Sequence, residues 1–344
     1  MPAFPTALPA ARTPDPMAAP ALRWGVLGTG WIAERFARSV QRHTRQSLTA
    51  VASRDHGRAE DFARGHGIPR AHGSYEELVA ASDLDVVYVA TEHTAHLTCA
   101  RLALEHGKHV LVEKPLALNA EEATEITRVA AERRLFCAEA LWSFFLPRYD
   151  IVRQVLEASV LGEIHTVLAD FGEHFTPDHR IMNPDLAGGP LLDLGVYPVS
   201  FATWVLGAPA QVMAAGQPHP AGVNGQISAV LRDAYGNQAV LHTTLFGDTP
   251  TTATIAGSHG TLTLPGPFNQ PGDVILTPPG GLALTFTEPR TAHDALCFEA
   301  ADAARCITAG RPQSPIRPLD DSITTLRVMD EIRAQCGIVF PAES

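Results

Sequence analysis

Long apolar runs are missing from this 344-residue sequence, and so is any excess of basic residues. No run approaches the roughly 20 apolar residues that a helix needs to cross a bilayer. Asp and Glu outnumber Lys and Arg by 37 to 26, which gives a formal net charge of -11. Because non-specific nucleic-acid binding requires a basic face, the composition argues against a membrane protein and against a nucleic-acid partner. A local basic pocket for a phosphorylated cofactor remains compatible with this charge.

Cysteines are also few: there are five, they are scattered, and none forms a C-x-x-C pair. This pattern is typical of reduced, buried thiols in a reducing compartment, so we expect neither a disulfide framework nor a metal site. The first 20 residues contain six prolines and no apolar core of signal-peptide length. We therefore expect residues 1–20 to form a disordered tail and the protein to be cytoplasmic.

The first half of the sequence predicts a parallel, doubly wound sheet. Apolar residues make up 45% of the chain, as in globular proteins, and the chain is longer than one core usually organises. Up to about residue 140, short β-branched runs alternate with amphipathic segments, which indicates a parallel sheet covered by helices on both faces. The predicted strands are Leu22–Leu27, Leu48–Ser53, Val86–Ala90 and His109–Val112, and the predicted helices lie near residues 32–42, 58–66, 75–81, 96–105 and 120–133.

After about residue 142 the pattern changes to successive strands separated by short turns, which predicts a mostly antiparallel sheet. A helix is predicted near residues 149–156, strands at 164–175, 227–232, 238–246, 251–256, 261–264 and 282–287, and closing helices near 295–308 and 320–336. We therefore expect a dinucleotide-binding domain over residues 21–140 and a substrate and oligomerisation domain over residues 141–344.

A glycine-rich loop follows the first predicted strand. Residues 28–33 read Gly-Thr-Gly-Trp-Ile-Ala, an accepted form of the dinucleotide fingerprint, and they open the first predicted helix. Gly28 permits a tight turn, and Gly30 lets the backbone approach a pyrophosphate, which the helix N-terminus then binds. A plain strand-to-helix turn is the alternative, but the context on both sides favours a nucleotide site. The predicted cofactor contacts in this loop are Gly28, Thr29, Gly30, Trp31 and Ile32.

The end of the second predicted strand indicates which nucleotide binds. Arg54 lies 26 residues after Gly28, near the position where an acidic residue holds the ribose of NAD. Ser53 and Arg54 suit a 2′-phosphate instead, and Arg58 is one turn further along. Asp55 argues the other way, because an inward carboxylate would select NAD. We expect NADP, with NAD as the alternative.

Two segments predict the catalytic groups. Glu113, Lys114 and a proline end a strand, which places Lys114 at the carboxyl edge of the sheet, where ligands bind. If the later segment is helical, Asp193 and Tyr197 lie on one face of it. A tyrosine with a pKa of about 10 is a poor base, but a nearby ammonium lowers that pKa. We expect Tyr197 to act as acid and base, Lys114 to support it, and Asp193 to orient a hydroxyl group or Lys114.

Further candidates follow from position and residue type. Residues just after the third predicted strand suit contact with the nicotinamide or its ribose; a plain helical turn and, third, a metal pair are the alternatives. Aromatic faces stack on sugar rings, although such residues are more often core. The additional predicted cofactor contacts are Thr91, His93, His96, Glu113 and Lys114, and the predicted substrate contacts are Trp142, Phe175, Arg180 and Asp193.

The sequence resembles the Gfo/Idh/MocA oxidoreductases, and within them the branch of dihydrodiol and D-xylose dehydrogenases. The resemblance covers nearly the whole chain from Leu22 and implies a Rossmann domain followed by an α/β domain with a large open sheet. It also implies NAD(P)-dependent alcohol–carbonyl chemistry on a small polyhydroxylated substrate, with the lysine and the tyrosine in the active site, and a homodimer or higher homo-oligomer. The motifs that carry it are RWGVLGTGWIAERF, AVASRD, YVATEHTAHL, GKHVLVEKPLALN, EALW, LLDLGVYPVS and SPIRPLDDSITTLRVMDEIRAQ.

Three positions depart from the family pattern. Relatives commonly have proline where Glu92 stands, arginine where Phe144 stands and aspartate where Asn183 stands, so the exact substrate does not transfer from them. Two other hypotheses stay open beside an NADP-dependent dehydrogenase or reductase of aldoses, dihydrodiols or related polyols. One is a nucleotide sensor without catalysis, and the other is an enzyme that recycles its cofactor during glycoside cleavage or epimerisation.

Overall fold

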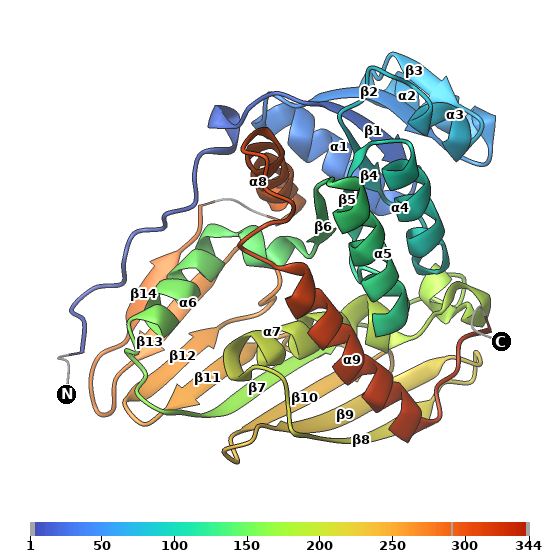
Figure 1. The fold of residues 1–344 in the computed structure, drawn as a ribbon. Coiled ribbons are helices and arrows are strands. Elements are labelled where there is room, and N and C mark those ends of the chain that lie inside the picture. Colours follow the sequence, from blue (N-terminus) through green and yellow to red (C-terminus); the bar gives the residue numbers. More distant parts are fainter. Residues whose placement is uncertain (1–3, 290–291, 342–344) are drawn as a thin grey trace. The chain divides into compact units, whose positions relative to one another are not determined.

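The computed structural model describes residues 4–289 and 292–341. The chain forms two compact units (Figure 1). The Rossmann unit comprises residues 14–145 and 292–323, and the open-sheet unit comprises residues 1–13, 146–291 and 324–344. Within the described ranges, no helix combines the length and the apolar character that a membrane crossing requires.

The Rossmann unit is built on a six-stranded parallel sheet with the order β3-β2-β1-β4-β5-β6. The order reverses between β1 and β4, and doubly wound sheets bind ligands beside this reversal, at the carboxyl ends of the strands. The predicted parallel sheet is therefore confirmed. Its strands are β1 (Arg23–Leu27), β2 (Ser47–Ala52), β3 (Arg70–His72), β4 (Val86–Val89), β5 (His109–Glu113) and β6 (Cys137–Ala140).

The helices of this unit form two groups: α1 contacts α2 and α8, whereas α4 contacts α3 and α5. Asn119 caps α5 by accepting the backbone N–H of Glu122 at 2.9 Å, the role that asparagine favours at a helix start. The helices are α1 (Trp31–His43), α2 (His56–His66), α3 (Tyr75–Val79), α4 (His96–Glu105), α5 (Ala120–Arg133) and α8 (Cys297–Thr308).

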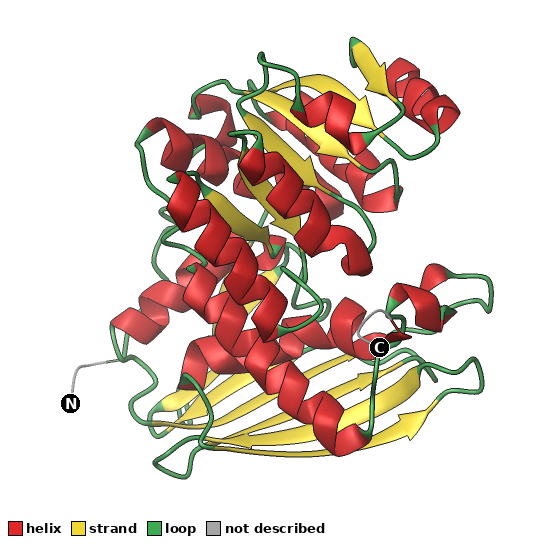
Figure 2. Ribbon diagram, turned by 45° about the vertical axis from the view of Figure 1, so that its right-hand side comes forward, coloured by secondary structure: helices red, strands yellow, loops and turns green. Residues whose placement is uncertain are grey.

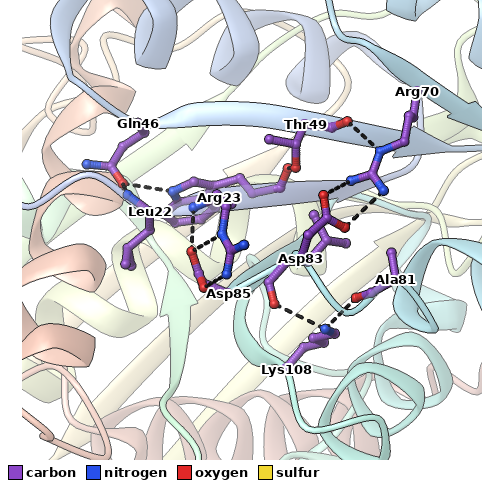
Figure 3. Close-up of polar contacts among 11 residues, drawn as sticks. Leu22, Arg23, Gln46, Thr49, Arg70, Ala81, Asp83, Asp85 and Lys108 are labelled. Atoms are coloured by element: carbon purple, nitrogen blue, oxygen red, sulfur yellow. Dashed lines mark hydrogen bonds and ion pairs between the residues drawn. The ribbon is translucent and has the colours of Figure 1, made fainter.

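A network of polar side chains lies at the amino ends of the parallel strands (Figure 3). Arg23, at the start of β1, pairs with Asp85, which precedes β4, at 2.6 Å. Lys108 precedes β5 and donates its ammonium to the carbonyl oxygens of Ala81 and Leu84. These groups stabilise the end of the sheet opposite to the edge where ligands bind.

The amino-terminal tail differs from the expected disorder. Arg12 binds the carboxylate of Asp150 through its guanidinium at 2.8 Å and through its backbone N–H at 2.6 Å. Further along, Ala19 packs against two alanines of α8. The described part of the tail, residues 4–20, thus lies on the folded chain, because one arginine and one small apolar residue give it specific contacts.

The open-sheet unit contains an eight-stranded sheet with the order β14-β13-β12-β11-β7-β10-β9-β8. Its neighbouring strands are antiparallel except for β7 and β10, which are parallel. The predicted large, mostly antiparallel sheet is confirmed. Its strands are β7 (Ile164–Gly172), β8 (Gln211–Pro218), β9 (Asn224–Arg232), β10 (Gln238–Thr244), β11 (Ala253–Gly257), β12 (Gly260–Leu264), β13 (Asp273–Thr277) and β14 (Leu284–Thr287).

One face of this sheet is covered by helices, and among the described residues no helix covers the other (Figure 2). α7 packs on β7 and β10, and α6 packs on β13. β7 alternates accordingly: Val167, Ala169 and Phe171 are buried, whereas Leu168 is exposed. The helices are α6 (Pro147–Glu157), α7 (Val196–Leu206) and α9 (Leu319–Cys336).

The structure adds four strands that the sequence did not predict, namely β3, β6, β8 and β13. It also changes the expected domain division. Residues 292–323, which include α8, belong to the Rossmann unit and not to the second domain. The division at residues 145/146 lies close to the predicted boundary near residue 140.

Candidate active site

The glycine-rich loop has the shape that a dinucleotide requires. Gly28 has φ +100°, and a Cβ there would lie 2.4 Å from the carbonyl oxygen of Ala90, so glycine is needed for both conformation and packing. A Cβ on Gly30 would meet no atom within 4 Å. The side chain of Thr29 has a buried hydroxyl with no hydrogen-bond partner in the part of the chain that the structure describes. An open cradle and an unsatisfied donor at a helix start fit a bound pyrophosphate.

The predicted selectivity residues lie at the end of β2. Asp55 caps α2 by accepting the backbone N–H of Arg58 at 3.2 Å, and Arg54 does not pair with this neighbouring carboxylate. Instead, Arg54 donates to Glu92 at 2.9 Å, and its side chain is 73% exposed. The hydroxyl of Ser53 accepts the Asp55 backbone N–H at 3.3 Å. The sequence did not predict the Arg54–Glu92 pair, although it singled out Glu92 as unusual.

The catalytic lysine candidate follows β5. The carboxylate of Glu113 accepts the Tyr88 hydroxyl and, at 3.1 Å, the backbone N–H of Lys114. The Lys114–Pro115 bond is cis. Beyond the proline, the backbone N–H of Leu116 donates to Glu139 of β6 at 3.1 Å. Both carboxylates are buried, so this segment is held on each side of Lys114 by a side chain from the sheet.

His96 joins two loops at the same edge of the sheet. Its Nδ1 lies 2.9 Å from the carbonyl oxygen of Pro115, and its Nε2 lies 3.2 Å from that of Thr91. His96 is fully buried, and its two contacts support the backbone of both loops, while its contact with the cofactor stays a prediction. The other predicted residue of this turn, His93, is also buried.

These contacts connect the predicted groups of the Rossmann unit along the carboxyl ends of β1, β4 and β5. Gly28 touches the backbone that precedes Thr91, and His96 links Thr91 to the residue after Lys114. The phosphate loop, the loop after β4 and the lysine therefore occupy one edge of the sheet. Their convergence at the switch point is the arrangement that doubly wound nucleotide-binding domains use.

Two glutamates and a histidine were missed by the sequence reasoning. The guanidinium Nε of Arg317 donates to the buried Glu139 at 3.2 Å. His293 lies between two indoles: its ring stacks on Trp142 at 5.2 Å and meets the edge of Trp31 at 4.7 Å. Burial lowers the pKa of His293. Glu139 opens the EALW motif, but no role was predicted for it, and Glu299 of α8 is discussed below.

In the open-sheet unit the segment that carries Asp193 and Tyr197, the second predicted catalytic segment, is helical, and it begins with a π-turn. Leu191–Gly195 form this turn, labelled η6, and α7 continues from it. Such turns are frequent at functional sites. Asp193 in the turn and Tyr197 in the first turn of α7 are both buried. The ring of Tyr197 lies 5.7 Å from that of Phe171 on β7.

Asp193 is held by a predicted substrate residue. The guanidinium of Arg180 donates to its two carboxylate oxygens at 2.5 and 3.3 Å. Phe175 packs against His179 at 4.5 Å, and burial together with the charge of Arg180 lowers the pKa of that imidazole. Trp142, in contrast, is buried against His293 in the Rossmann unit. Lys114 and Tyr197 belong to different units, so their meeting stays a prediction.

The described residues contain no group of three or more His, Cys, Asp or Glu side chains placed to hold a metal ion.

Comparisons with known proteins define the class. Residues 22–140 match the family model described as "Oxidoreductase family, NAD-binding Rossmann fold", and residues 149–263 match the GFO/IDH/MocA C-terminal domain. The protein is thus an oxidoreductase with an NAD-binding Rossmann domain. More narrowly, the chain belongs to the Gfo/Idh/MocA family, as the sequence predicted.

Individual relatives cover almost the whole chain. It is 34% identical to trans-1,2-dihydrobenzene-1,2-diol dehydrogenase of Xenopus tropicalis, over 93% of this chain and 100% of the relative. The Homo sapiens protein of the same name is 33% identical, over 94% and 99%. A 3-ketoreductase from Actinomadura kijaniata, solved with NADP and TDP-benzene, superimposes with a TM-score of 0.82 at 28% identity and covers 92% and 98% of the two chains.

A solved levoglucosan dehydrogenase complex with NADH and levoglucosan has a TM-score of 0.83 at 18% identity, covering 92% of this chain and 98% of that one. At this identity the likeness concerns the fold alone.

Proposed function

We propose that the protein is an NADP-dependent dehydrogenase or reductase that acts on a secondary or anomeric alcohol of an aldose, a dihydrodiol or a related cyclic polyol. The observation that carries this proposal is the convergence of the phosphate loop, the Thr91 loop and Lys114 on one edge of the sheet. The relatives named as dihydrodiol dehydrogenases, which match over 93% of the chain or more, support the substrate class.

A nicotinamide cofactor held by the glycine-rich loop would supply the hydride chemistry at the alcohol or carbonyl carbon. The residues of this chain supply the rest of the chemistry. Backbone N–H groups at the start of α1 bind the pyrophosphate, with Gly30 leaving room for it. Tyr197 takes the hydroxyl proton or gives it back, and the ammonium of Lys114 lowers the pKa of the phenol by favouring the phenolate.

Arg180 and Asp193 form an ion pair, Asp193 lies four residues before Tyr197, and this pair is suited to orient substrate hydroxyl groups. A carboxylate has about four acceptor positions on its two oxygens, so one group can hold an ion pair and also accept a hydrogen bond from a polyol. The A. kijaniata 3-ketoreductase has also been solved as a tyrosine-to-phenylalanine and as a lysine-to-alanine variant, which change the residue types that we assign to catalysis.

The proposed preference for NADP depends on Arg54. A guanidinium matches phosphate geometry and is the natural partner of a 2′-phosphate. Asp55, the residue that would favour NAD, uses its carboxylate to cap α2. We further propose that the protein is a cytoplasmic homodimer or a higher homo-oligomer.

The test combines binding with turnover. Fluorescence titrations with NADPH and NADH would measure the two dissociation constants, and a panel of aldoses and trans-dihydrodiols would then be screened by nucleotide absorbance. We expect tighter NADPH binding and turnover of at least one cyclic polyol. NADH binding more than tenfold tighter would overturn the cofactor assignment. Binding without an absorbance change on any substrate would indicate a sensor, and nucleotide retained through purification would indicate internal cofactor recycling.

A further inference from the structure

Glu299 is a buried acid that the proposed chemistry does not use. It lies in the first turn of α8 and is 1% exposed. Neither of its carboxyl oxygens has a hydrogen-bond partner in the described part of the chain. An ionised carboxylate in such surroundings is so unfavourable that a buried group normally takes up a proton instead. Burial accordingly raises the pKa of Glu299 well above its ordinary value of 4.5.

The charge that acts on Glu299 comes from the catalytic segment. α8 packs against β5, and the negative charge of Glu113, the last residue of β5, raises the pKa of Glu299 further. Glu113 itself accepts two donors, the Tyr88 hydroxyl and the Lys114 backbone N–H. A carboxylate that accepts two hydrogen bonds is stabilised in its ionised form. Of these two carboxyl groups, Glu299 is therefore the one that is protonated, and Glu113 is the one that is ionised.

Other ionisable groups around α8 have partners of their own. α8 also packs against α1, against the 3-10 helices η1 (Pro16–Ala18) and η3 (Trp142–Phe145), which contain no ionisable side chain, and against η7 (Ala292–Leu296). On α1, Glu34 pairs with Arg38, Arg42 and His43 pair with Asp294 of η7, and Arg35 lies over the ring of Trp31. On α8 itself, Arg305 donates to the carbonyl of Asp15, and the thiol of Cys306 donates to Asp302. His293 of η7 lies between Trp31 and Trp142.

We propose that Glu299 is a positioning residue: it stays a neutral acid behind Glu113, so that one negative charge, not two, stands beside Lys114. Two ionised carboxylates would repel each other, and Glu113 would be driven from the backbone N–H that it holds. The neutral acid thus keeps the turn at Lys114 in place and limits the negative field around the lysine. The effect on catalysis rests on the proposed function, whereas the protonation state does not.

The first experiment measures that protonation state. Infrared difference spectra between the wild type and Glu299→Gln at neutral pH should contain the C=O stretch of a protonated carboxylic acid, contributed by the wild type. Glu139→Gln is the matched control, because Glu139 is equally buried but paired with Arg317. The absorption spectrum of Glu139→Gln should still contain the C=O stretch that we assign to protonated Glu299. Absence of a protonated acid assignable to Glu299 would overturn the proposal.

Stability gives a second measure that needs no substrate. A glutamate whose pKa is raised on folding contributes its full stability below 4.5 and loses it as the pH rises toward the folded value. Relative to Glu299→Gln, the folded-to-unfolded ratio of the wild type should fall by up to about tenfold per pH unit above 4.5. Comparing slopes, not absolute stabilities, makes the result independent of any packing cost of the amide. Parallel curves for the two proteins would contradict a neutral Glu299.

The positioning role is tested on Lys114 itself. The sequence contains only two lysines, Lys108 and Lys114, so selectively labelled lysine amines give two NMR signals, with Lys108 as the internal control. When the wild-type Glu299 ionises at high pH, a second carboxylate charge acts beside Lys114, so we expect the Lys114 signal, but not that of Lys108, to show an additional pH-dependent step. Glu299→Gln and Glu299→Leu are neutral at every pH and should both lack this step, and the pH profile of kcat should contain it in the wild type alone.

A Lys114 titration that is the same in the wild type and in Glu299→Gln up to high pH would overturn the positioning role. If no substrate were turned over at all, the proposed function would fail, while the infrared, stability and NMR results would still decide the proposal on Glu299.

Discussion

At the scale of single residues, the ion pair of Arg54 with Glu92 affects how strongly Arg54 can bind a phosphate. Its exposed guanidinium is well placed at the end of β2 for a 2′-phosphate, yet the structure pairs it with Glu92 at 2.9 Å. A carboxylate at that distance competes with a phosphate for the same donors. The departure of Glu92 from the proline of the relatives therefore bears directly on cofactor choice.

Replacing Glu92 should strengthen NADPH binding. Exposed ion pairs contribute about 0.2–1 kcal/mol, so Glu92→Gln should tighten NADPH by up to about fivefold and leave NADH unchanged. Arg54→Gln is the control, and it should weaken NADPH by roughly tenfold or more, because hydrogen bonds to charged groups contribute about 1.5–3 kcal/mol. Fluorescence titration measures both. Equal changes for the two nucleotides would show that neither residue faces the 2′-position.

At the scale of elements, the loop between β1 and α1 contains two glycines that are needed for different reasons. Gly28 is required by the fold, since its φ is +100° and Ala90 leaves no space for a Cβ. Gly30 has an extended backbone and open space, so the fold does not require a glycine there. The space beside Gly30 is therefore open to a ligand.

The two alanine variants should therefore differ. Gly28→Ala should lower the free energy of unfolding by roughly 1–3 kcal/mol, the cost of a strained backbone with a clash added. Gly30→Ala should fold as stably as the wild type and lose nucleotide affinity, because its methyl group fills the cradle. Denaturant unfolding and nucleotide titration distinguish the two effects. A Gly30→Ala protein that binds NADPH normally would place the pyrophosphate elsewhere.

Local patterns predicted most elements of the Rossmann unit and the position of its phosphate loop and lysine. The sequence missed β6 because its four residues include Glu139, whose partner Arg317 lies 178 residues away. It missed β3 because none of its three residues is fully buried, so no apolar run marks it. The return of α8 to the first unit and the parallel pairing of β7 with β10 are likewise set by contacts between distant segments. The proposed role of Glu299 also depends on a contact between distant segments, the packing of α8 against β5.

At the scale of the whole molecule, the uncovered face of the eight-stranded sheet presents a row of apolar side chains. Met213, Val230, Val240 and Leu168 stand side by side in register across β8, β9, β10 and β7. Three of them are 44–47% exposed. A contiguous apolar row on an open sheet is the kind of surface that protein interfaces bury.

We therefore expect this face to carry the homo-oligomer contact. Val240→Glu would place a charge at the centre of the row and should convert an oligomer into monomers, measured by light scattering after size exclusion. Leu282→Glu is the matched control, since Leu282 is 91% exposed in the loop before β14 and outside the row. A wild-type protein that is monomeric at micromolar concentration, or a Val240→Glu oligomer, would contradict this assignment.

The central claim is that Tyr197 exchanges a proton with the substrate while a hydride moves to or from the nicotinamide. Stopped-flow absorbance with the Tyr197→Phe variant tests it most directly, using the best substrate from the polyol panel. Loss of general acid–base catalysis should slow hydride transfer by about 10²- to 10⁴-fold with the NADPH dissociation constant nearly unchanged. A Tyr197→Phe enzyme that transfers hydride at the wild-type rate would contradict the account.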